Sequence, residues 1–124
     1  MSLPKVEIKT QPQFEPEQSS IAEGQYFYSY RICIRNLKGQ SCQLISRHWL
    51  ITDANGHKQE VIGDGVVGQQ PVIEEGKEFR YTSGCLLETP VGTMEGYYVM
   101  RTDDGEEFHA PITPFLLSVP GTVN

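Results

Sequence analysis

The sequence has few of the features that mark membrane, secreted or metal-binding proteins. Its longest apolar run is four residues, whereas a membrane-spanning helix needs about 20, and the first residues contain no apolar export signal. The three cysteines, Cys33, Cys42 and Cys85, are odd in number and form no C-x-x-C pair. This argues against a disulfide framework and against a structural zinc site. We therefore expect a cytoplasmic protein with reduced thiols and no membrane association.

Basic residues are also scarce. Ten lysines and arginines stand against sixteen acidic residues in a chain of 124, which gives a formal net charge of -6. The bases are scattered along the sequence, whereas a surface that follows nucleic-acid phosphates needs them clustered. We therefore expect no nucleic-acid binding. The length suits one domain, residues 1–124, with a hydrophobic core of its own.

Residue types used in catalysis are present without the spacing that catalysis or metal binding requires. His48, His57 and His109 include no pair two or four residues apart, as a metal site would favour. Cys85 has no neighbouring base to activate its thiol, and the acidic run at 103–107 lacks the spacing of a calcium loop. We therefore expect a non-enzymatic protein with no cofactor and no metal site.

The dominant pattern is an alternation of apolar and polar residues in short runs, separated by glycine and proline. Residues 26–36 carry tyrosine or isoleucine at every even position from 26 to 34, and a period of two predicts a half-buried strand. Weaker patterns predict strands at 6–10, 59–62, 71–73, 78–83, 95–102, 107–112 and 115–119, with connections at 11–24 and 84–92. Eight or nine short strands predict an all-β fold, an antiparallel β-sandwich.

The third predicted strand, residues 42–53, carries Ile45, Trp49 and Ile51 on one parity. These side chains are therefore expected on the same, inward face. The Asn55-Gly56 pair that follows predicts a hairpin with a type I′ turn, because that turn needs positive φ at both central residues.

A glycine-rich segment offers a candidate anion site. Gly63, Gly65 and Gly68 follow the G-x-G-x-x-G spelling of dinucleotide-binding loops, in which bare backbone amides close around a pyrophosphate. A Rossmann unit also needs a helix after the loop, and Pro71 interrupts the chain there. Asp64 would repel an anion. The open alternatives are a nest of amides that holds an anion and a set of plain glycine turns.

Four long segments closely resemble the ApaG family, which is also called CorD. They are SRHWLITDANG (46–56), GDGVVGQQPVIEEG (63–76), YTSGCLLETPVGTMEGYYVM (81–100) and DDGEEFHAPITPFLLSVP (103–120). The resemblance implies a β-sandwich similar to fibronectin type III and Ig-like domains. It also implies a bacterial cytosolic protein with a genetic association to cobalt resistance and magnesium efflux. The family's domain is also fused within eukaryotic F-box proteins and a DNA-polymerase-delta-interacting protein, where it looks like an interaction module.

Two functions are therefore expected as alternatives. The leading one is protein–protein interaction with an unidentified partner, or as a homodimer, through an edge strand or a loop. The tyrosines at 26–30 would suit an interface, unless they line the core. The alternative is a small-ligand binder that holds pyrophosphate or a nucleotide at Gly63, Gly65 and Gly68, as proposed for the family. The ion association is expected to be indirect, because the sequence shows neither membrane spans nor a coordination site.

Overall fold

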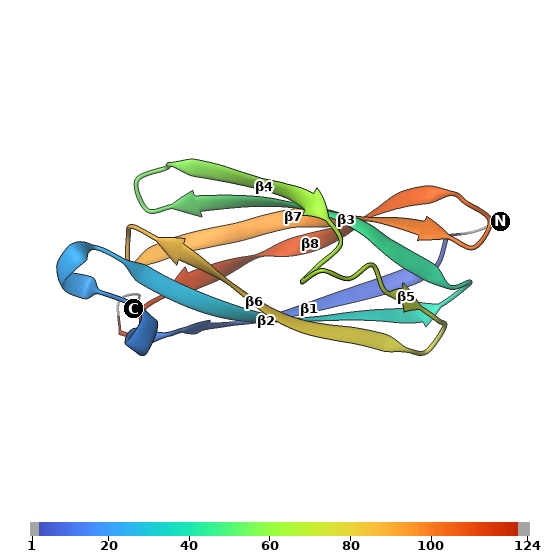
Figure 1. The fold of residues 1–124 in the computed structure, drawn as a ribbon, viewed down its shortest axis with the longest axis horizontal. Coiled ribbons are helices and arrows are strands. Elements are labelled where there is room, and N and C mark those ends of the chain that lie inside the picture. The colour runs from blue at the N-terminus through green and yellow to red at the C-terminus, as the bar shows by residue number, and fades with distance from the viewer. Residues whose placement is uncertain (1–2, 122–124) are drawn as a thin grey trace.

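Residues 3–121, which the computed structural model describes, form two antiparallel sheets (Figure 1). The strands are β1 (Lys5–Phe14), β2 (Tyr26–Lys38), β3 (Cys42–Asp53), β4 (Lys58–Asp64), β5 (Val72–Ile73), β6 (Glu78–Leu87), β7 (Val91–Thr102) and β8 (Glu107–Ser118). One sheet has the order β1-β2-β6; the other has the order β4-β3-β7-β8, and β5 pairs with the start of β3. The predicted antiparallel β-sandwich is confirmed. The 3-10 helices η1 (Pro16–Gln18) and η2 (Ile21–Glu23) are short, and no helix within residues 3–121 has the length and apolarity to cross a membrane.

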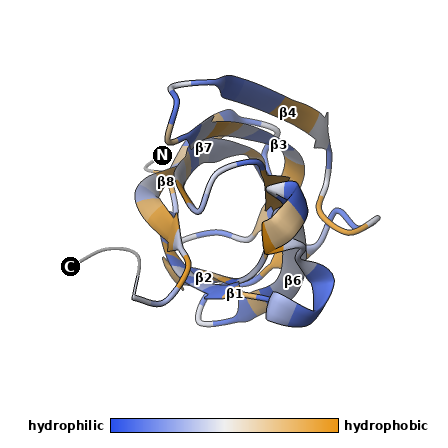
Figure 2. Cartoon of the chain, turned by 90° about the vertical axis from the view of Figure 1, so that its left-hand side faces the viewer, coloured by the Kyte–Doolittle hydropathy of each residue, from blue (hydrophilic) through white to orange (hydrophobic). Residues whose placement is uncertain are grey.

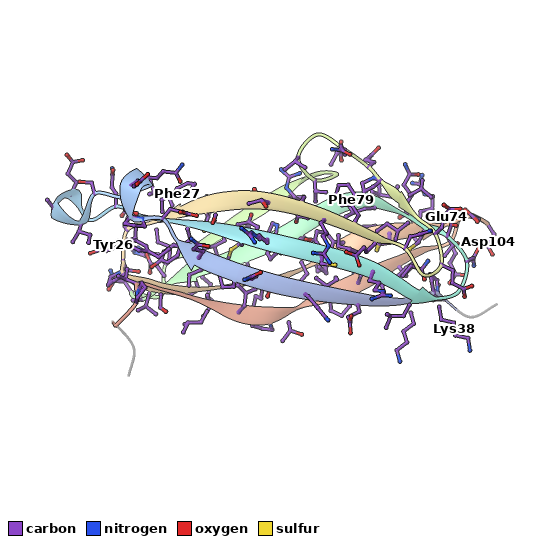
Figure 3. The ribbon with its side chains drawn as sticks, turned by 90° about the horizontal axis from the view of Figure 1, so that it is seen from below. Tyr26, Phe27, Lys38, Glu74, Phe79 and Asp104 are labelled. Atoms are coloured by element: carbon purple, nitrogen blue, oxygen red, sulfur yellow. The ribbon has the colours of Figure 1, made fainter. Side chains whose placement is uncertain are left out.

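The alternation in β2 sorts its side chains between core and solvent as predicted. Tyr28, Tyr30, Ile32 and Ile34 are buried and contribute to the core shared by the two sheets. The residues between them point to the outer face of the three-stranded sheet, onto which Figure 3 looks. Burying each large apolar side chain contributes about 1.5–3 kcal/mol. Tyr28 and Tyr30 are therefore core residues, and they form no exposed interface.

A β-bulge in β3 changes which parity faces the core. Cys42 and Leu44 are buried at the start of the strand, whereas Trp49 and Ile51 are buried further along it. The change occurs where the pairing with β7 shifts register, between Leu44 and Ser46. One extra residue in a bulge moves every later side chain to the opposite face. The prediction that Ile45 shares the inward face with Trp49 was therefore wrong, because Ile45 precedes the change in parity.

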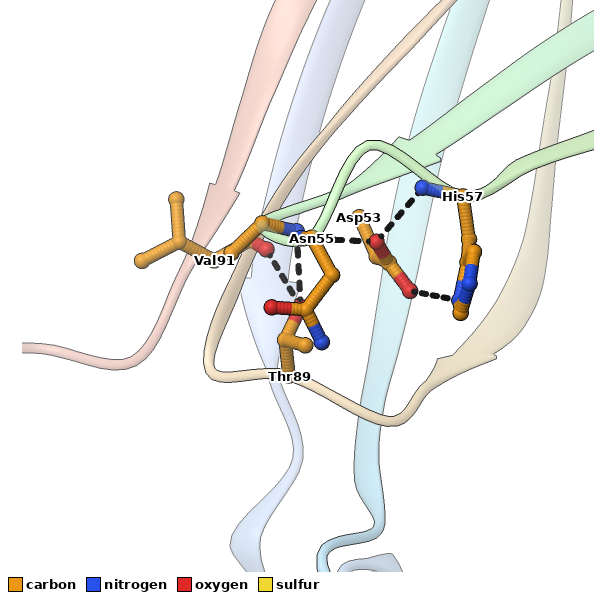
Figure 4. A network of polar contacts seen from close by, with 6 residues as sticks. Asp53, Asn55, His57, Thr89 and Val91 are labelled. Atoms are coloured by element: carbon orange, nitrogen blue, oxygen red, sulfur yellow. Dashed lines mark hydrogen bonds and ion pairs between the residues drawn. The ribbon is translucent and has the colours of Figure 1, made fainter.

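The β3–β4 hairpin is present, but its turn differs from the predicted type I′. Gly56 has a positive φ of 83°, and Asn55 does not. The Asp53 carboxylate accepts hydrogen bonds from the amides of Asn55 at 2.9 Å and His57 at 3.0 Å (Figure 4). This bonding favours a type I turn closed by a left-handed glycine. Thr89 accepts a hydrogen bond from the same turn and so ties it to the β6–β7 connection.

Several strands run further than the alternation suggested, and β1, β6 and β8 differ most in what they imply. β1 continues to Phe14, whose ring lies 5.5 Å from that of Tyr28. β6 continues through Gly84 to Leu87 along the β2 register, so the expected connection at 84–92 was mostly wrong. β8 is one strand across Pro111 and Pro114, with a register shift in its pairing with β7. Proline is tolerated there because β8 lies at a sheet edge.

The two sheets approach each other differently on their two sides. β1 lies against β8 and closes one side of the sandwich. On the opposite side, β4 and β6 lie apart (Figure 2). The edges of β4 and β6 are not paired with each other, and the segment that joins them, in which Val66 and Ile73 are buried, lies between them (Figure 1).

Candidate functional site

A hollow of about 300 Å³ opens between the two sheets beside β6. Its walls come from β2, β3, β6 and the segment after β4. The lining residues are Tyr30, Arg47, Trp49, Asp64, Val66, Val67, Gly68, Tyr81 and Ser83. The lining combines three aromatic rings with charged, hydroxyl and small residues. A concave site with converging polar groups is a candidate ligand or anchor pocket.

Arg47 is the one charged side chain that β3 sends toward this hollow, since it shares the parity of the buried Trp49 and Ile51. Its guanidinium donates hydrogen bonds to the carbonyl oxygens of Asp64 at 3.1 Å and Gly65 at 2.9 Å. An arginine that faces inward at the open side of a sandwich secures the neighbouring loop. It also places a fixed positive charge beside the hollow.

The phenol groups of Tyr30 and Tyr81 line the same hollow as Arg47. The hydroxyls of Tyr81 and Tyr98 are hydrogen-bonded to each other, and burial raises the pKa of both. Burial also raises the pKa of Tyr30, while the positive charge of Arg47 lowers it in part. These phenols are therefore neutral hydrogen-bonding groups at ordinary pH. The site combines the Arg47 cation, the Asp64 carboxylate, neutral hydroxyls and aromatic faces, and it suits a polar group carried on an apolar stem.

The three predicted anion-binding glycines lie near one another but have different surroundings. Gly68 lines the hollow, and Gly63 lies against the Arg47 guanidinium, which would be 2.9 Å from an added Cβ. The Gly65 amide donates to the carbonyl of Ile45 at 2.8 Å. Of the three glycines, the structure thus places only Gly68 in the lining of the hollow, and it uses the Gly65 amide within the fold. Their anion binding remains a prediction.

The turn beside the hollow is strained. Val66 and Gln69 exchange two backbone hydrogen bonds of 2.8 and 2.9 Å across a two-residue loop. Val67 and Gly68 at its centre have φ of 43° and 79°, as in a type I′ turn. A β-branched residue at positive φ is an outlier that costs about 1–3 kcal/mol. The Val67 side chain is 52% exposed, so burial there does not offset this cost.

The histidines lie outside the hollow. His48 is bonded through its ring nitrogens to the Tyr97 hydroxyl at 2.9 Å and to Glu60 at 3.2 Å. Tyr97 stacks on His109 with ring centroids 4.2 Å apart, and the exposed His57 pairs with Asp53. These groups belong to the outer face of the larger sheet and to the β3–β4 turn. Within residues 3–121, no three His, Cys, Asp or Glu side chains are grouped to hold a metal ion.

The cysteines and the acidic run make no further site. Burial raises the pKa of Cys42 and of Cys85 to about 11. Burial and the Glu78 carboxylate raise the pKa of Cys33, so all three thiols are protonated and weakly nucleophilic near neutral pH. Residues 103–106 form the β7–β8 turn, and Glu107 is the first residue of β8. The Thr102 hydroxyl donates a hydrogen bond to the Asp104 carboxylate in this turn.

Comparison with known proteins identifies the family. The sequence pattern described as the ApaG domain matches residues 16–102. The chain belongs to the ApaG family. Protein ApaG of Xanthomonas campestris is 52% identical over 120 residues, which cover 97% of this chain and 94% of the relative. Protein ApaG of Anaeromyxobacter dehalogenans is 50% identical over 119 residues, which cover 96% of this chain and 94% of that relative.

Solved structures agree with this assignment. The crystal structure of an ApaA protein from Bordetella pertussis superposes with a TM-score of 0.93 at 45% identity, covering 96% of this chain and 97% of its own. A protein from Archaeoglobus fulgidus has a TM-score of 0.58 at 8% identity, which shows a shared fold alone. None of these descriptions names a catalytic activity.

Sequence reasoning missed Arg47 as a site residue. Its parity with Trp49 and Ile51 was the available signal, since a charged residue in step with two core residues must face inward. Because the bulge lies before Arg47, this parity holds through the rest of the strand. The glycines were predicted from a sequence motif. Arg47, which faces the hollow, could have been predicted from its position on one face of a strand.

Proposed function

We propose that this chain is a non-catalytic binding module that accepts an extended protein segment along the free edge of β6. The observation that carries the proposal is the contrast among the edge strands. β1 contains Pro12, and β8 contains Pro111 and Pro114. Proline removes an amide donor and prevents edge pairing. β1 and β8 also lie against each other.

β6 lacks these protections. It contains no proline, and its residues from Tyr81 to Leu87 carry no charge. Its outer edge pairs with no other strand within residues 3–121. β4, the other open edge, carries charges at Lys58, Glu60 and Asp64. Such charges disfavour strand addition, so β6 is the more receptive edge.

One hollow lies beside the middle of β6 and another beside its end. The Arg47 hollow adjoins Tyr81 and Ser83, and a second hollow of about 240 Å³ adjoins Leu86 and Leu87. The two are about 10–15 Å apart along the strand, given a rise of about 3.3 Å per residue. In strand addition, backbone bonds supply affinity and pockets for alternate side chains supply specificity. A strand added to β6 would have both.

The test uses peptides selected from a random twelve-residue library on the immobilised protein. We expect enriched peptides to shift and protect the backbone amides of residues 82–87 in NMR spectra. Leu86→Lys should weaken binding about tenfold or more, because a charge at the edge opposes pairing. Leu116→Lys is the matched control on β8, since the two leucines are 48% and 45% exposed. An equal effect of the two variants, shifts confined to other strands, or a library without enriched sequences would reject the proposal.

A second copy of the chain is one source of such a strand, and the homodimer remains a proposal. Sedimentation velocity at rising concentration tests it, and Leu86→Lys should then favour the monomer. The association with cobalt and magnesium is likewise proposed to be indirect, through the bound partner.

The alternative function is the binding of a small anion, either pyrophosphate or a nucleotide, at Gly63, Gly65 and Gly68. Arg47 supports it, because its positive charge lies beside these residues. Gly65 is unsuitable for mutation, since an added Cβ would lie 2.1 Å from the Gln69 carbonyl oxygen. We expect pyrophosphate at millimolar concentration to raise the melting temperature, and Arg47→Met to remove that rise. No rise in the unmodified protein would reject this alternative.

A further inference from the structure

The outer face of the three-stranded sheet concentrates positive charge. Lys9, Arg31, Arg35 and Arg80 extend from β1, β2 and β6 onto this face, and all four are exposed. We call these four residues the basic face. They are four of the ten lysines and arginines in a chain of net charge -6. The bases that appear scattered in the sequence are brought together by the strand register.

The basic face has a hollow at its centre. Cys33 pairs with Lys9 on one side and Arg80 on the other, and its side chain is much shorter than either. The resulting depression has a volume of about 560 Å³ and is also lined by Arg31. A carboxylate placed above Cys33 would have Lys9, Arg31 and Arg80 around it. It would share Arg80 with the Glu78 carboxylate, which accepts the Cys33 thiol hydrogen bond at 3.5 Å.

Part of this positive charge has no partner within the protein. Lys9 lies 3.9 Å from Glu7, and Arg80 is paired with Glu78. Arg31 and Arg35 form no close ion pair in the part of the chain described, although Arg35 lies in register between Glu7 and Glu78. They lie four residues apart on β2, about 13 Å along the strand. Two unpaired guanidiniums at this spacing match acidic side chains four residues apart in a parallel, extended segment.

The face becomes apolar toward the start of β2. Ser29 bonds Glu15, which limits the positive area. Beyond it lie Phe27, near one end of the sheet in Figure 3, and the exposed Leu86 with which it pairs. Phe27 covers Gly84, whose added Cβ would be 2.5 Å from the Phe27 ring. A ligand bound along β2 would thus contact the cations at Arg35 and Arg31, and then the apolar Phe27 four residues from Arg31.

We infer that the basic face binds an acidic, extended segment of a partner protein, with carboxylates over Arg35, Arg31 and the Cys33 hollow. The charge favours carboxylates over a nucleic-acid strand. Four bases accompanied by Glu7 and Glu78 leave a small positive excess, whereas binding of a phosphate backbone needs a base for each phosphate contacted. This inference is separate from strand addition at β6, because it uses side chains on the face of the sheet.

The test uses fluorescently labelled hexaglutamate as the probe. We expect saturable binding with NMR shifts at Arg31, Cys33 and Arg80. Raising salt from about 0.05 M to 0.5 M should weaken it, because the charges are exposed. The double variant Arg31→Gln, Arg35→Gln should weaken binding about tenfold, since each exposed ion pair contributes up to a factor of about five.

Arg101→Gln is the matched control, because Arg101 is an exposed arginine on the other sheet, 2.8 Å from Glu107. It should leave hexaglutamate binding unchanged. The inference is overturned by an absence of saturable binding, by an equal loss in the control, or by tighter binding of a labelled thymidine hexanucleotide. Thermal melts of each variant check that the fold is retained. The double variant Arg31→Gln, Arg35→Gln changes no residue of β6 and should leave peptide addition at the β6 edge intact, so the two proposals fail independently.

Discussion

Replacing Arg47 by methionine tests whether this arginine holds the segment after β4 in place. Methionine keeps an unbranched apolar stem, which still fits beside Trp49 and Tyr81. It removes the guanidinium that donates to the carbonyls of Asp64 and Gly65. The change therefore deletes one charge and two hydrogen bonds while leaving most of the packing intact.

The expected loss of unfolding free energy follows from these two bonds. A hydrogen bond to a charged group contributes about 1.5–3 kcal/mol when it is shielded. The bond to Asp64 is exposed and the bond to Gly65 is only partly buried, so water replaces part of each. We therefore expect a total loss of about 2 kcal/mol. For a domain of this length, that corresponds to a fall in melting temperature of roughly 6–12 °C.

Urea unfolding gives the free energy, and amide hydrogen exchange locates the change. Exchange at Gly65 and Val66 should accelerate, because their segment loses its attachment to β3. Exchange in the centre of β2 should follow only the global stability. Arg101→Met removes an arginine with an exposed ion pair, and it should cost less than about 1 kcal/mol.

Two results would refute this reasoning. If Arg47→Met and Arg101→Met had the same stability within about 0.5 kcal/mol, the two carbonyl bonds would contribute nothing measurable. If the loss were large but exchange at Gly65 and Val66 rose no more than elsewhere, Arg47 would act through the core and not through the loop.

Three further changes test the fold around the site. Gly96→Ala places a Cβ 1.9 Å from the His48 carbonyl oxygen, so β3 and β7 must separate, and urea unfolding should show a loss of about 3 kcal/mol or more. Val67→Asn gives an Asn-Gly pair at a turn that needs positive φ, and a thermal melt should show a gain of about 0.5–1 kcal/mol. Asn36→Asp puts a carboxyl where a buried amide donates to two backbone carbonyls at 3.0 and 3.1 Å. The neutral acid is favoured there. The unfolding free energy of the variant should therefore be closest to that of the unmodified protein below about pH 4, and it should fall as the pH rises above that value.

Each of these has a control and an outcome that contradicts it. Gly105 has open space around its Cβ position and a φ of 88°, so Gly105→Ala should cost only about 1 kcal/mol of strain. Equal losses at Gly96 and Gly105 would contradict the proposed clash. A lower melting temperature for Val67→Asn would show that the valine side chain stabilises the turn. A pH-independent loss for Asn36→Asp would mean that the new carboxyl reaches water.

Local patterns in the sequence were enough for the sandwich and for several of its strands. β2 was predictable because Tyr28, Tyr30, Ile32 and Ile34 alternate with polar residues, and only a two-residue period buries all four on one face. The bounds of β3 were predicted at 42 and 53 and observed at Cys42 and Asp53. These features depend on side-chain direction and turn chemistry within a few residues, which the chain itself encodes.

Features that depend on non-local pairing appeared only in the tertiary structure. The bulge after Leu44 is set by the register of β3 against β7, and it decides that Ile45 leaves the core and Arg47 enters the hollow. Gly84 was predicted to begin a connection, but in the structure it is a residue of β6 beneath Phe27. Because glycine has no Cβ and allows many backbone conformations, the residues packed around it determine which one it adopts.

The distribution of charge shows the same division. A count of residues determines that the protein is acidic overall, with sixteen acids against ten bases. The sequence also shows that Arg31 and Arg35 lie four residues apart and so share a face of one strand. The gathering of Lys9 and Arg80 beside them required the pairing of β1 and β6 with β2. Electrostatic recognition depends on distances in space, and hydrogen bonds between strands set those distances.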